Sequence, residues 1–249
     1  MICCDVPMPK LFPRHGTSVL DRHNSEEDSA LMRRSALFAG LSPQECKEIL
    51  FYARIRNLAR NERLFSQDQR IDKLHMIRSG SVKLTQLSPD GREVILWING
   101  PGDAVGMHAD AVGCYHSCSA QAIESCQIFF WEYSLHQLLI NRYPQIQINL
   151  GRILSSRLRE LEERFREVAS ERVPKRLALL LLRLLRSVGK ENRDGVDLGL
   201  TREDLAQMTG TTIFTISRVL SKWADFGFVV SRRGGVVICD PDRLRCLAG

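Results

Sequence analysis

The 249-residue sequence predicts an α+β protein built from an antiparallel β domain, one long helix and a small helical domain that ends in a β-hairpin. Three observations support this prediction. Short β-prone runs separated by turn residues fill residues 54–133, and apolar residues recur every three or four positions over 150–168. Two helical segments joined at Gly210 then precede a hairpin pattern.

Composition and charge restrict the function classes. The chain has 44% hydrophobic and 26% charged residues, which excludes a disordered or fibrous protein. No apolar run approaches the about 18 residues that cross a membrane, and no secretory signal pattern opens the chain. We therefore expect a cytoplasmic protein whose eight cysteines are reduced. Residues 172–249 carry the whole net charge of +6, which indicates a polyanionic partner.

The N-terminal part predicts an arm followed by two helices. Residues 1–30 contain prolines and an acidic stretch, and we expect a flexible arm there. Leu31–Phe38 predicts a short helix. Ser42, Pro43 and Glu45 then form the capped start of a second helix, with Ser as N-cap and Pro at the first helical position.

Four β-prone runs follow, with turn residues between them: Lys73–Ile77, Val82–Leu87, Val94–Ile98 and Gln127–Trp131. This spacing predicts an antiparallel sandwich or roll. The turn Ser88–Gly91 indicates a hairpin, because its Pro fixes φ and its Gly supplies a positive φ.

A long helix with one narrow apolar seam comes next. The seam consists of Leu150, Leu154, Leu158, Leu161, Phe165 and Val168, at spacings close to the 3.5-residue repeat of a coiled coil. Such a seam needs a partner surface, and we predict a homodimer. The alternative is that the helix packs back onto its own β domain.

The last part predicts a winged helix-turn-helix. Residues 174–188 indicate a buried helix, and residues 189–199 a loop. Thr201 to Asp204 caps the start of a further helix, which Gly210 ends. Thr212 caps the second helix, which runs to about Phe226.

A hairpin over residues 229–238 completes the motif, and Cys239 and Cys246 flank a terminal turn. In a winged helix-turn-helix the second helix lies in the DNA major groove. With the localised positive charge, this predicts a DNA-binding protein. The alternative is a helical hairpin that binds no nucleic acid.

These motifs resemble those of the family of the cAMP receptor protein and the fumarate–nitrate regulator (the CRP/FNR family). The resemblance covers residues 36–249 and is carried by Leu74–Lys83, Gly91–Val94, Pro101–Gly106, Thr201–Gly210, Thr215–Leu220 and Arg233–Gly235. It implies a β-roll sensor domain over 31–140, a dimerisation helix over 141–170 and a winged helix-turn-helix over 171–249. It also implies a homodimer that regulates transcription at a palindromic DNA site, with RNA polymerase as partner.

The family's base-reading positions fall on Thr212, Ile213, Phe214, Ser217 and Arg218. Arg218 keeps the family pattern, and we predict that it contacts guanine. Phe214 replaces the usual Glu, which accepts from cytosine, and Phe can instead pack on a thymine methyl. We therefore expect a departure from the usual half-site at this position. The candidate phosphate contacts are Thr201, Arg202, Lys222 and Arg232.

To predict the signal, we compare residues of this chain with the ligand-binding residues of three branches of the family. The cyclic-nucleotide branch uses a Glu and an Arg where this chain has Met107 and Cys118, so we do not expect cAMP. His108 matches the axial haem ligand of the carbon-monoxide-sensing branch. Cys114, Cys118 and Cys126 leave an iron-sulfur cluster, another metal site or a thiol switch open.

The sequence thus predicts a regulator that responds through its β-roll to a redox, gas or metal-linked signal rather than to cAMP. The alternative is a constitutive DNA-binding dimer with a degenerate, ligand-free roll. Neither a Gly-rich phosphate loop nor a nucleophile elbow occurs in the sequence, so we expect no enzymatic activity.

Overall fold

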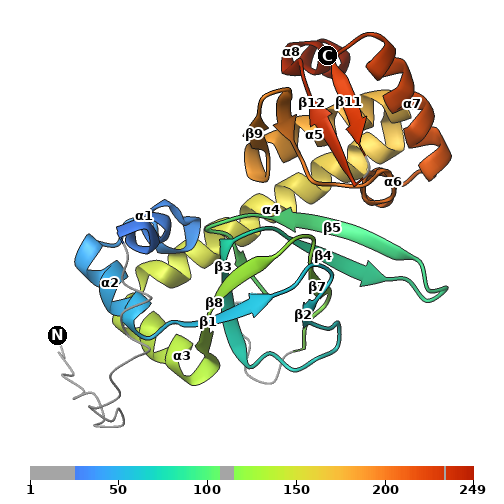
Figure 1. The fold of residues 1–249 in the computed structure, drawn as a ribbon. Coiled ribbons are helices and arrows are strands. Elements are labelled where there is room, and N and C mark those ends of the chain that lie inside the picture. Colours follow the sequence, from blue (N-terminus) through green and yellow to red (C-terminus); the bar gives the residue numbers. More distant parts are fainter. Residues whose placement is uncertain (1–25, 107–114, 233) are drawn as a thin grey trace.

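The computed structural model of the chain describes residues 26–106, 115–232 and 234–249. Figure 1 shows a β-roll with helices at one end, the long helix α4 (Gln145–Ser170), and a separate C-terminal domain at the far end of α4. This arrangement confirms the predicted α+β fold.

The roll consists of two four-stranded antiparallel sheets, with strand orders β1-β8-β3-β6 and β2-β7-β4-β5. Its strands are β1 (Arg54–Leu58), β2 (Arg63–Phe65), β3 (Lys73–Ser79), β4 (Val82–Leu87), β5 (Glu93–Asn99), β6 (Ala104–Val105), β7 (Ser119–Ala122) and β8 (Cys126–Glu132). The four predicted strands are all present. Gly91 has φ 81°, as the predicted hairpin turn between β4 and β5 requires.

Each strand of the first sheet contributes side chains to two hydrophobic cores, because successive side chains point to opposite faces of the sheet. Ile77 and Ile128, which pair across β3 and β8, lie in the interior of the roll. Their neighbours Met76 and Phe129 also pair, and they lie in a second core against the N-terminal helices and α4.

Four helical segments cover that second core: α1 (Glu26–Arg34), the 3₁₀ turn η2 (Ala36–Phe38), α2 (Pro43–Phe51) and α3 (Tyr133–Arg142). The predicted capping box opens α2, since Ser42 Oγ accepts from Glu45 N and Glu45 Oε2 accepts from Ser42 N. Residues 26–30, which the sequence analysis assigned to the arm, lie in helix α1. There buried Asp28 accepts hydrogen bonds from the Arg78 guanidinium at 2.6 and 3.2 Å.

Helix α4 begins at Gln145, directly after Pro144, rather than at residue 141. Its first half packs on its own roll, where Leu150 is buried and Asn149 donates hydrogen bonds to the carbonyls of Leu37 and Ala39. Leu150 therefore does not belong to the free seam. The later seam positions Leu158, Leu161, Phe165 and Val168 are exposed in the single chain.

The C-terminal domain contains α5 (Val173–Ser187), β9 (Lys190–Asn192), β10 (Gly195–Asp197), α6 (Arg202–Thr209), α7 (Ile213–Asp225), β11 (Val229–Arg232), β12 (Gly235–Ile238) and α8 (Pro241–Ala248). Two expectations are wrong here. Residues 189–199 hold the hairpin β9–β10, because β10 pairs with β12 in the sheet β11-β12-β10-β9. The predicted terminal turn is helix α8, which Asp240 caps and whose Leu244 is buried in the domain core.

The C-terminal domain packs directly on the roll of the same chain. Ile95 and Ile98 of β5 belong to the hydrophobic core of the C-terminal domain. Lys83 Nζ of β4 lies 3.6 Å from carboxylate oxygens of both Asp204 on α6 and Glu93 on β5. At the end of α4, buried Glu167 accepts two hydrogen bonds from Arg183 of α5 at 2.7 and 2.8 Å. These contacts connect the roll, α4 and the helix-turn-helix.

One histidine makes the stability of the roll depend on pH. His75 of β3 is 5% exposed and lies beside the Phe65 ring. Burial, with a smaller contribution from nearby His116, lowers the pKa of His75 to about 3. Between about pH 6.5 and pH 3 the unfolded chain therefore binds a proton at this imidazole that the folded chain does not bind.

We predict that His75→Leu flattens the acid dependence of folding. In the wild type this residue lowers the free energy of unfolding by up to about 1.4 kcal/mol for each pH unit below 6.5. Urea unfolding between pH 7 and pH 4.5 measures the slope for both proteins. Equal slopes would contradict the prediction, and a change of overall stability in the variant does not affect this comparison.

Candidate nucleic-acid interface

Local capping fixes the helix-turn-helix geometry. Thr201 Oγ1 accepts from Asp204 N at 3.1 Å, and Asp204 Oδ2 accepts from Thr201 N at 2.9 Å, so the predicted capping box opens α6. Gly210 ends α6 with φ 63° and ψ 44°, a left-handed conformation that suits glycine. Thr212 Oγ1 then accepts from Thr215 N and caps α7. The turn between the two helices is therefore specified by residues close together in sequence.

Helix α7 has one buried and one exposed face. Ile216, Val219, Leu220 and Trp223 are buried, as the sequence predicts. The opposite face begins with Thr212, Ile213 and Phe214 and continues to Arg218 and Lys222, all exposed. Phe214 is 83% exposed. A large apolar side chain held this far into solvent at the start of a helix is available for contact with a ligand.

The structure brings the predicted base-reading residues together on the N-terminal half of α7. Ser217 is half-buried beside exposed Arg218. Neither Arg218 nor Lys222 forms an ion pair with any residue in the described part of the chain. The exposed N-terminus of α7, where Thr212 caps only Thr215 N, also presents backbone N–H groups, which attract phosphate. This surface combines base-edge donors with an anion-binding end.

The other predicted phosphate contacts are already engaged. Thr201 Oγ1 donates to Asp204 Oδ2 at 2.6 Å, so its hydroxyl serves the cap. Arg202 Nε donates to Ser231 Oγ at 3.2 Å and joins α6 to the wing strand β11. Arg232 pairs with Asp194 of the β9–β10 turn. Arg232 would have to leave Asp194 to reach a phosphate.

Of the predicted sensor residues, the structure describes Cys118 and Cys126, which belong to the roll. His108 and Cys114 fall outside the described residues. Cys118 is half-buried, and Cys126 is buried and donates to the carbonyls of Ser81 and Glu124 at 3.2 Å. Burial raises the pKa of both thiols, which disfavours the reactive thiolate.

Within residues 26–106, 115–232 and 234–249, no three His, Cys, Asp or Glu side chains are grouped so that they could hold a metal ion. Cys118 and Cys126 alone therefore do not make up a ligand set for haem or a cluster. The DNA-binding surface on α7 does not depend on either group.

Two arginines of α4 were not among the residues predicted from the sequence. The guanidinium groups of Arg157 and Arg164 both lie 5.6 Å from the ring centre of Trp97 on β5. Arg164 donates to the carbonyls of Leu96 on β5 and of Met208 on α6. The seven-residue spacing of the two arginines places them on one helix face, and that spacing was the available signal.

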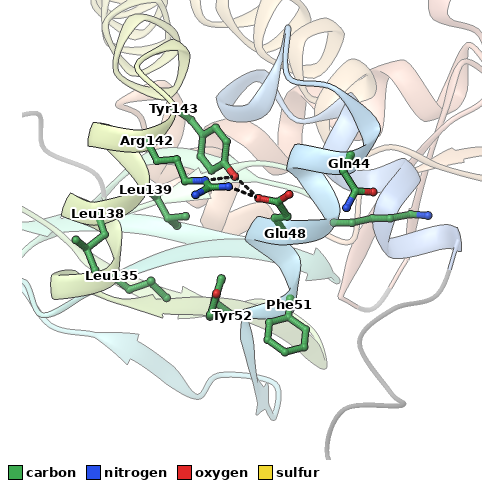
Figure 2. A pocket seen from close by; sticks show the side chains of 10 residues that line it. Gln44, Glu48, Phe51, Tyr52, Leu135, Leu138, Leu139, Arg142 and Tyr143 are labelled. Atoms are coloured by element: carbon green, nitrogen blue, oxygen red, sulfur yellow. Dashed lines mark hydrogen bonds and ion pairs between the residues drawn. The ribbon is translucent and has the colours of Figure 1, made fainter. Parts of the chain in front are cut away.

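An apolar pocket of about 430 Å³ lies between α2 and α3. Figure 2 shows Phe51, Leu135 and Leu138 on its walls, with the linked side chains of Glu48, Arg142 and Tyr143 at one side. Tyr143 Oη donates to Glu48 Oε2 at 2.6 Å, and Arg142 donates to the same oxygen at 3.0 Å. Helices α2 and α3, which line the pocket, lie at the end of the roll away from the helix-turn-helix (Figure 1).

Comparisons with known proteins agree with this geometry. Residues 55–143 match the cyclic nucleotide-binding domain, and residues 175–247 match the Crp-like helix-turn-helix domain. The cyclic AMP receptor protein of Thermus thermophilus is 31% identical over 80% of this chain and 89% of its own length. The nitrogen fixation regulation protein FixK of Bradyrhizobium diazoefficiens is 27% identical over 87% of this chain and 91% of its own length.

The solved structure of FixK2 from Bradyrhizobium japonicum shows the same fold, with a TM-score of 0.69 at 23% identity over 79% of this chain and 98% of that chain. The fold and the α7 surface thus define a DNA-binding transcriptional regulator. The chain belongs to the CRP/FNR family. Its relatives are transcription regulators rather than enzymes. None of the described helices is both long and apolar enough to span a bilayer.

Proposed function

We propose that the protein is a homodimeric, sequence-specific regulator that reads a palindromic DNA site with α7. The observation that carries this proposal is the capped, exposed N-terminal half of α7, where Phe214 and Arg218 face solvent together and Arg218 forms no ion pair within the described residues. The proposal that RNA polymerase is a partner is supported only by membership of the family. Binding to DNA is consistent with the cytoplasmic location expected from the sequence.

In this mechanism α7 enters the major groove with its N-terminus foremost. Arg218 donates two hydrogen bonds to a guanine edge, and the Phe214 ring packs on a thymine methyl group. Thr212, Ile213 and Ser217 complete the base-facing surface. Lys222 and Arg202 neutralise phosphates and set the register, with Thr201 and Arg232 joining them where their present partners are released.

Dimerisation supplies the second half-site. The exposed seam of Leu158, Leu161, Phe165 and Val168 continues toward the C-terminal domain, so pairing two α4 helices brings two α7 helices to the same DNA. Half-sites read this way lie one helical turn, about 34 Å, apart. A change in the roll that moves α4 would re-aim both recognition helices.

We propose a redox, gas or metal-linked signal that enters through the roll. Cys118 occupies the position of the family's phosphate-binding Arg, and a half-buried neutral thiol gives a cyclic phosphate no counter-charge. His108, Cys114, Cys118 and Cys126 remain the candidate sensor residues, with haem or an iron-sulfur cluster as candidate cofactors. The raised pKa values of the described thiols favour ligand or cofactor sensing over a thiolate switch.

Base readout is the first prediction. Arg218→Ala should weaken specific DNA binding about 5- to 150-fold, because a bidentate guanine contact contributes about 1–3 kcal/mol. Phe214→Glu should change the preferred base at its position in a selection from random DNA. Lys222→Ala is the matched control. It should weaken binding to all DNA sequences alike and lower the slope of log affinity against log salt concentration by about 1. An unchanged preferred site in Phe214→Glu would contradict the readout model.

Dimer formation through α4 is the second prediction. The double variant Leu158→Asp/Phe165→Asp should sediment as a monomer and lose affinity for a two-half-site DNA, because it places four carboxylates in one apolar seam. Arg159→Ala, on the opposite side of α4, should stay dimeric. A dimer that survives the double variant would place the interface elsewhere.

The signal is tested on protein purified without air. An absorption spectrum with iron analysis, followed by a DNA titration with and without reductant, separates the two classes of regulator. Two results support cofactor sensing. One is a Soret band that is lost in His108→Ala. The other is a broad absorption band, with bound iron and sulfide, that is lost in Cys118→Ser. A colourless protein whose DNA affinity is equal under all conditions supports the constitutive dimer with a degenerate roll.

A further inference from the structure

A cavity of about 290 Å³ lies where the roll, α4, α5 and α6 meet. We call it the junction cavity. Its walls carry Trp97 and Asn99 from β5, Arg157 and Arg164 from α4, and Arg183 and Arg186 from α5. It borders both the sensor domain and the helix-turn-helix. A water molecule takes about 30 Å³ of liquid, so the volume suits a ligand of several heavy atoms.

Positive charge exceeds negative charge in this cavity. Four arginines line it, against the two acidic residues Asp103 and Glu160. Asp103 is engaged in its own turn, where Oδ2 accepts from Gly100 N at 2.9 Å. Among the described residues, no carboxylate lies within ion-pair distance of the guanidinium groups of Arg157, Arg164 or Arg186. Glu160 still interacts electrostatically with both Arg157 and Arg164, so the four arginines are balanced only in part by the two carboxylates. A half-buried guanidinium whose charge is balanced only in part is costly, because its hydration is only partly replaced.

The arginines retain unused hydrogen-bond capacity. Arg157 donates to the Ala104 carbonyl at 3.2 Å, and Arg164 donates to backbone carbonyls of β5 and α6. These contacts occupy only part of the five N–H donors that each guanidinium carries. Arg183 binds Glu167 through its two terminal nitrogens, while its buried Nε has no hydrogen-bond partner in the structure.

The Trp97 ring holds the two α4 arginines in place. Both guanidinium groups lie 5.6 Å from its centre, which is within cation–π range. A planar guanidinium that is already positioned loses little freedom when it binds an oxyanion. The cluster is therefore preorganised for a group with several oxygen acceptors.

We propose that the junction cavity binds a small phosphate-type oxyanion, with Arg157, Arg164 and Arg186 as its main ligands. Such an anion presents oxygens to more than one guanidinium fork and supplies the missing negative charge. Free phosphate and the phosphate group of a small metabolite share this chemistry.

The position of the site connects it to DNA binding. Arg164 bonds Met208 of α6, and Arg183 joins α5 to α4. An anion that draws Arg164 into the cavity competes with its contact to α6, and thereby changes how the helix-turn-helix docks on β5. The anion-binding site itself does not depend on the proposed DNA readout.

The test is titration calorimetry of the full-length protein with inorganic phosphate, pyrophosphate and glucose 6-phosphate at constant ionic strength. We expect saturable binding of one anion per chain. Arg157→Gln and Arg186→Gln should each weaken it roughly tenfold or more, since a hydrogen bond to a charged group is lost. Arg159→Gln, on the opposite side of α4, and Arg218→Ala, on the DNA-binding face, should bind like the wild type.

The outcomes are distinct. Tighter binding of glucose 6-phosphate than of phosphate identifies a phosphorylated metabolite, and the reverse identifies the free anion; both support the site. Absence of saturable binding, or wild-type affinity in Arg186→Gln, overturns it. Arg186 is exposed, so its variant folds even where Arg157→Gln does not. Loss of binding in Arg218→Ala would overturn it as well, because the anion would then occupy the α7 surface.

Discussion

Helix α4 presents three different faces to its surroundings. Because the helix repeats every 3.6 residues, one short stretch of sequence can supply all three faces. Leu150 faces the helix-covered core of the roll. Arg157 and Arg164, seven residues apart, face Trp97 on β5. Leu158 and Phe165, also seven residues apart, are left exposed beside them. Neighbouring positions in the sequence therefore belong to different interfaces, and a displacement of the helix alters all three together.

The helix-turn-helix is tied to this helix through side chains that serve two contacts. Asp204 caps α6 and lies 3.6 Å from Lys83 of the roll. Arg164 reaches from α4 to α6, and Ile95 of β5 lies in the core of the DNA-binding domain. The recognition helix α7 is thus rigid within its domain, because caps and a buried apolar face fix it. Its direction relative to the roll depends on the contacts that Lys83, Ile95 and Arg164 make with the C-terminal domain.

The roll itself is built around neutral groups. His75 and the thiol of Cys126 are both buried in their uncharged forms, since burial shifts their pKa values away from the charged states. Relatives of this chain carry names as different as cyclic AMP receptor protein and nitrogen fixation regulation protein. A shared architecture therefore does not identify the signal, which has to be inferred from the side chains of each chain.

The sequence by itself determined the elements whose signals are local. Ser42 with Glu45, Thr201 with Asp204, and Gly210 act within one helical turn, so the helix starts and the turn before α7 could be predicted from neighbours in the chain. The β-prone runs between turn residues likewise predicted β3, β4, β5, β8 and the hairpin β11–β12, and the three-to-four-residue apolar spacing predicted the long helix and the inward face of α7.

Only the tertiary structure decided what depends on distant partners. Helix α1 is held on the roll because Asp28 meets Arg78, and residues 189–199 form strands because β10 meets β12. From the sequence alone, Arg157 and Arg164 belong to the polar face of a helix. They become the wall of a charged cavity only because β5, about 60 residues earlier in the chain, places the Trp97 ring 5.6 Å from each guanidinium. Contacts across such separations leave no periodic pattern, since the energy of each depends on a fold that is already formed.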